Sequence, residues 1–147
     1  MIDLLVLRSA LPGAALAACV MFASPALAET ISFKADLKAS EEVPPNDSKG
    51  TGTVTATYDT ASKKLTWKGN YSGLSGPATM AHFHGPAEPG KNAGVAVPIT
   101  PSASPFENSA NLTDAQAADL MAGRWYVNVH TSAHPGGEIR GQLVKGM

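Results

Sequence analysis

The sequence predicts an all-β domain, an antiparallel β-sandwich or Greek-key barrel of about seven strands with one short helix. Several segments alternate apolar and polar residues with a period of two, which is typical of half-buried strands. Breaks rich in glycine and proline separate these segments at short intervals, as in sandwiches and barrels. One segment alone carries the start and stop signals of a helix.

The N-terminal 28 residues are set apart from this domain. Arg8 precedes a charge-free run that ends in the small-x-small sequence Ala26-Leu27-Ala28, which predicts a secretory signal peptide cut before Glu29. Proline and glycine interrupt the run, so we expect no membrane span in the mature form. An alternative is a bacterial lipobox that ends at Cys19 and would attach a lipid anchor there. Either way, we expect a periplasmic or secreted protein.

The predicted mature chain, residues 29–147, has the length of one domain. Its sequence has no cysteine, because Cys19 is the only one in the chain, so thiolate metal sites and cysteine nucleophiles are excluded. The net charge is −1 and there is no basic stripe, so nucleic acid is not an expected partner. Nucleophile-elbow, P-loop and dinucleotide-binding motifs are also missing from the sequence, which favours a protein that is not an enzyme.

The strands and the helix follow in order along the chain. The predicted strands are residues 31–37, 53–58, 65–71, 80–84, 95–99, 125–131 and 138–144. Gly69 indicates a bulge in the third of them, and Pro98 makes the fifth an edge strand. Residues 102–111 are predicted to be irregular. A helix follows, with Thr113 as its N-cap, Gln116 completing a capping box and Gly123 ending it.

Histidines and other polar residues recur on one face of the last strands. Side chains alternate across a strand, so His82 and His84 share a face, and Asn128 shares one with His130. Glu138 and Arg140 do the same in the final strand. If the apolar faces form the core, these polar faces point outward to solvent. There Glu138 and Arg140 are expected to form a surface ion pair or cross-strand contacts. Asn128, Glu138 and Arg140 are candidate ligand-binding residues.

The histidines suggest a candidate metal site on this face. Neutral imidazole is the commonest protein ligand for copper and zinc. His82, His84 and His130 are the predicted ligands, His134 on the following turn is a reserve fourth, and copper is expected before zinc. We expect the loops 86–93 and 111–123 to cover the site in part. The alternative is that these imidazoles only hydrogen-bond their neighbours and hold loops in place. For Glu41 and Glu42 we expect simple solvation in a loop.

Five segments, in this order, resemble the CHRD (chordin-type) domain family: Glu42–Pro45, Gly73–Pro77, Ala81–Ala87, Tyr126–Thr131 and Gly137–Leu143. The resemblance covers essentially the whole predicted mature chain, and is closest to the single-domain, bacterial-type exported members. It implies a secreted or periplasmic β-rich domain. In animal chordin the domain is repeated within an extracellular antagonist of bone morphogenetic proteins, but nothing in this sequence points to a growth-factor partner.

A fainter likeness is to copper–zinc superoxide dismutase. That family also has a strand bearing His-x-His, a later strand that ends in a copper-ligand histidine, and an arginine further on. His82, His84, His130 and Arg140 stand at the corresponding places. The metal-bridging histidine, the zinc-ligand loop and the disulfide cysteines have no counterparts, so the likeness implies at most a mononuclear copper site.

Three functional hypotheses follow, of which the last is a purely structural envelope protein. The first is a non-enzymatic extracytoplasmic binding module whose partner is a protein or an envelope polymer. The second is a histidine-based copper or zinc protein with a site like that of superoxide dismutase.

Overall fold

The computed structural model describes residues 27–146. Residues 1–26 of the predicted signal peptide, with Cys19 among them, lie outside the described residues. Signal cleavage and lipid attachment therefore stay predictions.

The described chain consists mostly of strands. In order, the elements are β1 (Thr30–Lys38), the short 3-10 helix η1 (Ala39–Glu41), β2 (Thr51–Asp59), β3 (Lys64–Ser72), β4 (Ala78–His84), β5 (Val95–Pro98), β6 (Phe106–Asn111), α1 (Asp114–Met121), β7 (Tyr126–Thr131), β8 (Ile139–Gln142) and β9 (Val144–Lys145).

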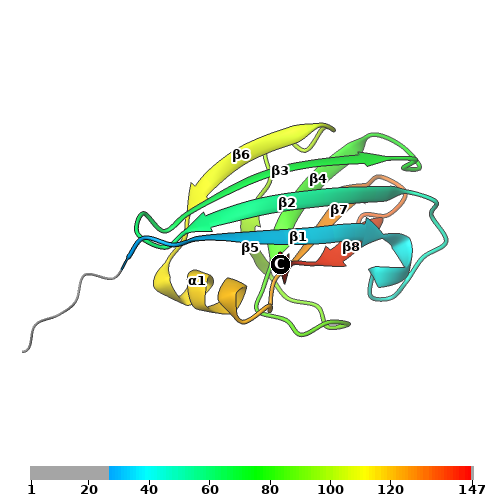
Figure 1. Cartoon of the computed structure of the whole chain (residues 1–147). Coiled ribbons are helices and arrows are strands. Elements are labelled where there is room, and N and C mark those ends of the chain that lie inside the picture. The colour runs from blue at the N-terminus through cyan, green and yellow to red at the C-terminus, as the bar shows by residue number, and fades with distance from the viewer. Residues whose placement is uncertain (1–26, 147) are drawn as a thin grey trace, which may run out of the picture.

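All strand pairs are antiparallel and form one sheet with the order β5-β4-β7-β8-β1-β2-β3-β6, with β9 paired to β1. The sheet curls into a nearly closed, barrel-like shape, so that β1, β2, β3 and β6 lie over β4 and β7 (Figure 1). Trp67 of β3 meets Phe83 of β4 across the interior, with ring centroids 5.1 Å apart in an edge-to-face arrangement. The predicted fold class is confirmed.

The core is built from the alternation that the sequence shows. In β1, Phe33, Ala35 and Leu37 are buried while the residues between them are exposed. β3 alternates in the same way, and in β2 the residues between the buried ones are half-buried or exposed. Trp67 and Trp125 are both buried, as expected of core aromatics. The polar residues that alternate with the buried ones form the outer surface of β1, β2 and β3.

The strand count is nine in the described chain rather than seven. One added strand is β6, in the segment predicted to be irregular; Phe106 is its one buried residue, and Ala110 packs against the core in part. β6 is a strand because it pairs with the edge of β3 from Lys64 to Gly69. The other comes from a break at Leu143, which divides the last predicted strand into β8 and β9.

Gly69 does not form a bulge, because the register between β2 and β3 is continuous through it. The Phe106 ring lies over it instead, so close that a Cβ at position 69 would stand 2.5 Å from the ring. Glycine is needed there for packing.

The helix α1 has the predicted capping box: Thr113 Oγ1 accepts from Gln116 N, and Gln116 Oε1 accepts from Thr113 N. Gly123 follows with a φ of 73°. Leu112 and Leu120 are buried in the hydrophobic core, so this segment covers the core.

Candidate metal centre

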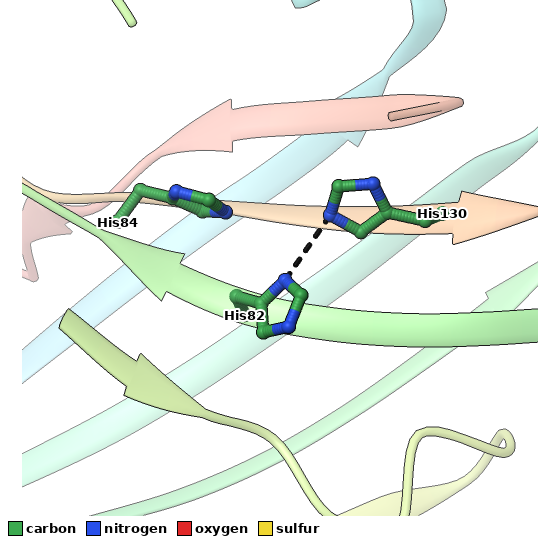
Figure 2. Close-up of side chains that lie close together, drawn as sticks. All are labelled: His82, His84 and His130. Atoms are coloured by element: carbon green, nitrogen blue, oxygen red, sulfur yellow. Dashed lines mark hydrogen bonds between the residues drawn. The ribbon is translucent and has the colours of Figure 1, made fainter. Parts of the chain in front are cut away.

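Three histidines from two neighbouring strands come together on one face of the sheet. β4 and β7 pair with His82 opposite Asn128, which places His130 diagonally beside His82. His82 Nδ1 lies 3.1 Å from His130 Nε2, and the three rings have one candidate ligand nitrogen each within 4.8 Å of the others (Figure 2). The predicted juxtaposition of His82, His84 and His130 is therefore present in the fold.

Backbone carbonyls determine which nitrogen two of these rings present. His84 Nδ1 lies 3.0 Å from the carbonyl oxygen of Ala93, and His130 Nδ1 lies 2.9 Å from that of Pro135. A carbonyl oxygen only accepts, so each Nδ1 carries the proton and each Nε2 of the neutral ring keeps its lone pair. Metal-binding histidines are commonly oriented by such a bond from the other ring nitrogen.

The spacing of these nitrogens suits a single ion. Metal–nitrogen bonds of about 2.0–2.1 Å place two ligand nitrogens about 3 to 4 Å apart on one ion. His82 Nδ1 and His130 Nε2 are joined by a hydrogen bond of 3.1 Å, which His82 donates because His130 carries its own proton on Nδ1. This separation lies in the range for two ligands of one ion, which would take the place of the shared proton, and all three candidate nitrogens lie within 4.8 Å of one another. His84 Nε2 is buried and has no hydrogen-bond partner within the protein.

The local environment favours neutral imidazoles. Burial lowers the pKa of His82, and the neighbouring His130 and His84 lower it further. Burial also lowers the pKa of His84, although the hydrogen bond to Ala93 opposes this in part. A neutral ring has the free lone pair that a metal ion needs.

The other histidine of the predicted set is elsewhere. His134 lies on the turn after β7, where its backbone N–H and carbonyl both bond to Thr131. The cluster of potential ligands in the described chain comprises His82, His84 and His130, without His134.

The predicted polar face is not open to solvent. Asn128, Glu138 and Arg140 are 3%, 0% and 2% exposed, so the expectation of outward-facing side chains was wrong for them. Two loops cover this face: Asn92 of the loop after β4 donates to Val43 O in the loop after η1. Alternation within one strand could not show that loops distant in the chain cover this face.

Glu138 and Arg140 also do not form the predicted ion pair. Glu138 accepts hydrogen bonds from Ser48, Ser75 and Thr131. Burial alone would raise the pKa of Glu138, but these bonds outweigh it and lower the pKa to about 2.

Arg140 supports the histidine cluster from the side. Its guanidinium donates to Asn92 Oδ1 at 2.7 Å and to Lys91 O at 2.5 Å. It also lies 3.5 Å from the centre of the Tyr126 ring, and Tyr126 stacks on His84 with centroids 4.8 Å apart and planes 3° from parallel. The stack of Arg140, Tyr126 and His84 holds the His84 ring in its orientation.

Glu42 belongs to this buried layer, although the sequence suggested only solvation. It is 6% exposed, and burial raises its pKa to about 7, with Arg140 and Asn128 acting in the opposite direction. Its Oε1 has no hydrogen-bond partner within the protein. Gly137, at a φ of 128°, approaches so closely that a Cβ there would collide with the Glu42 carboxylate. In the sequence, the only indication that Glu42 is more than a solvated loop residue was its position in a proline-rich motif.

These features define a class of protein: an antiparallel, barrel-like β domain with a polar face covered by loops. Three histidines from β4 and β7 cluster on that face. The family model of the CHRD domain matches residues 33–143, which include every residue of that cluster. The chain therefore belongs to the CHRD-domain family. No curated protein and no solved structure matches it. Within residues 27–146, no helix has the length and apolar character needed to cross a bilayer.

Proposed function

We propose that this CHRD-domain protein binds one copper ion outside the cytoplasm through His82, His84 and His130. The observation that carries the proposal is that one nitrogen from each of the three rings lies within 4.8 Å of the others, while carbonyl contacts at Nδ1 leave the Nε2 atoms of His84 and His130 unprotonated. His130 Nε2 accepts from His82, and His84 Nε2 has no partner within the protein. Buried polar atoms normally have a partner. An ion at this position would supply one to His84 Nε2.

Copper is favoured over zinc by the donor set. The cluster offers imidazole nitrogens and no carboxylate, and for such ligands Cu(II) binds more tightly than Zn(II) in the general affinity order. His82 is only half-buried, so one side of the ion would stay open to a water molecule or a small ligand. A location outside the cytoplasm rests on the predicted signal peptide of residues 1–28.

Titration of the metal-free protein with Cu(II) and Zn(II) tests the proposal. The chain is expressed with its own leader, and mass spectrometry of the product distinguishes a free N-terminus at Glu29 from an acylated Cys19. We expect one Cu(II) per chain at micromolar concentration or below, and a loss of affinity of at least a thousandfold in His84→Ala and His130→Ala. His134→Ala is the matched control and should bind like the wild type. A wild-type protein that binds no Cu(II) at millimolar concentration would refute the proposal.

A second candidate function is the non-enzymatic binding module for a protein or an envelope polymer. The supporting observation is a shallow groove on the outer face of β2, β3 and β6, lined by hydroxyl, amide and charged side chains that include Thr55, Lys68 and Glu107. The buried Asn128, Glu138 and Arg140 do not offer such a contact surface. Co-sedimentation with isolated cell envelopes, compared with Lys68→Glu, tests this function; equal recovery of the two proteins would count against it.

A further inference from the structure

Met80 lies beside the histidine cluster and is not part of the predicted ligand set. Side chains alternate along β4, so Met80 projects from the same face as His82 and His84. Its cross-strand partner in β7 is His130. Directly opposed residues of an antiparallel pair have Cβ atoms about 4.5–5.5 Å apart. The methionine is therefore an immediate neighbour of a proposed copper ligand.

Met80 is one of a few large hydrophobic residues of the described chain that stay exposed. It is 48% exposed, and the other large hydrophobic residues in the described chain that are comparably open are Leu27, Val95 and Val144. Ala81 and Phe83 are the residues of β4 that pack in the core, so Met80 lies on the other face of the strand. Met80 instead extends the surface formed by the three imidazoles.

The methionine side chain has the reach and the chemistry of a ligand. Its three rotatable bonds let the sulfur move toward an ion held by the adjacent histidines. A thioether is a soft donor that selects Cu(I), whereas imidazole serves copper and zinc alike. A thioether as fourth donor would therefore shift the site's preference toward Cu(I). It would have a smaller effect on whether the site binds copper at all.

We propose that Met80 supplies the fourth ligand of the copper site, so that three imidazoles and one thioether bind Cu(I) as well as Cu(II). This inference rests on the proposed copper function of His82, His84 and His130. It adds a soft donor for Cu(I), which the imidazoles alone do not provide.

The substitution Met80→Leu tests the inference, because leucine keeps the apolar volume and removes the sulfur. Cu(I) affinity is measured anaerobically by competition with the chelator bicinchoninate, and Cu(II) affinity by direct titration. We expect Cu(I) affinity to fall at least tenfold and Cu(II) affinity to change by less than threefold. Each tenfold weakening of Cu(I) relative to Cu(II) lowers the one-electron reduction potential by 59 mV. Met121→Leu, at the end of α1 and packed against the core, is the matched control and should change neither affinity.

X-ray absorption of the Cu(I) protein provides an independent readout. We expect scattering from one sulfur at about 2.3 Å in the wild type and none in Met80→Leu. Unchanged Cu(I) affinity and the absence of sulfur scattering would overturn the role of Met80, while the loss of binding in His130→Ala would still support the three-histidine site. A wild type that binds no copper would overturn both proposals.

Discussion

Two groups of polar side chains are buried around β7, and they differ in how many of their hydrogen-bonding atoms have partners. The first is the Glu138 pocket, formed by Glu138, Ser48, Ser75 and Thr131. Oε1 of Glu138 accepts from Ser48 Oγ at 2.6 Å and Ser75 N at 2.7 Å, and Oε2 accepts from Ser75 Oγ at 2.6 Å and Thr131 Oγ1 at 2.5 Å. Both oxygens have two donors, so the pocket is complete within the protein.

The second is the histidine cluster with the buried Glu42 and Asn128 beside it. Here His84 Nε2, Glu42 Oε1 and Asn128 Oδ1 are buried and have no hydrogen-bond partner within the protein. A complete network stabilises the fold, whereas an incomplete one indicates where a ligand or ordered water is accommodated. The difference assigns a structural role to the Glu138 pocket and supports a binding role for the histidine cluster.

The sharpest test of this difference uses two adjacent residues of β7. His130→Ala should reduce Cu(II) affinity at least a thousandfold and change the stability of the metal-free protein little. Thr131→Val should have the opposite profile: it removes a donor to buried Glu138, which costs about 1–3 kcal/mol, and leaves Cu(II) affinity within threefold. Metal titration and urea unfolding measure the two effects. Copper binding that depends on Thr131 and not on His130 would invert the assignment.

Glu138→Gln should destabilise the protein by about 3 kcal/mol at neutral pH, because the amide brings an N–H₂ group against existing donors. In the wild type the pKa of Glu138 falls from 4.5 unfolded to about 2 folded. A lowered pKa contributes stability above about pH 4.5, and this contribution is lost as the pH falls toward 2. Urea unfolding between pH 2 and 7 measures the slope, and an equally steep slope in the variant would exclude Glu138 as its source.

Glu42 should show the opposite pH dependence. Its pKa rises from 4.5 to about 7 in the folded state, so the native protein holds this proton more tightly than the unfolded chain. Stability should therefore fall by about 2–3 kcal/mol as the pH rises from about 4.5 to 7. Glu42→Gln imitates the protonated form and should remove that decline. The measurement is urea unfolding of the metal-free protein over this pH range, and a variant that declines as the wild type does would contradict the expectation.

The smallest effect is expected for Tyr126→Phe. The ring stays between Arg140 and His84, but the hydroxyl no longer accepts from Ala93 N or donates to Ala93 O. We expect a loss of about 1 kcal/mol in stability and of a few-fold in Cu(II) affinity, because the loop that orients His84 is held less firmly. Thermal unfolding and titration provide the values. An affinity loss as large as that of His130→Ala would show that Tyr126 does more than support the loop.

Several elements were predictable because their signals are local. Alternation in β1, β2 and β3 identified the core face, and the pair Thr113 and Gln116 identified the start of α1. The His-x-His spacing placed His82 and His84 on one side of β4. Which side chains share a face of a strand or helix depends only on the local backbone geometry, so it can be predicted from neighbouring residues in the sequence.

Other features depended on segments far apart in the chain. β6 has little alternation and is a strand because β3 offers it an edge. The ion pair expected between Glu138 and Arg140 gave way to partners about 50 to 90 residues away, such as Asn92 and Ser48. Glu42 and His134 were misjudged for the same reason. The packing of their loops brings Glu42 into the buried layer and leaves His134 outside the histidine cluster.

The sequence by itself determined the all-β class, the helix and the faces of the strands, since these follow from periodicity and capping along neighbouring residues. Only the tertiary structure decided that the polar face is covered, that three imidazoles from β4 and β7 converge, and that Met80 stands opposite His130. Convergence depends on strand register and loop packing, which are set by contacts between residues distant in the chain.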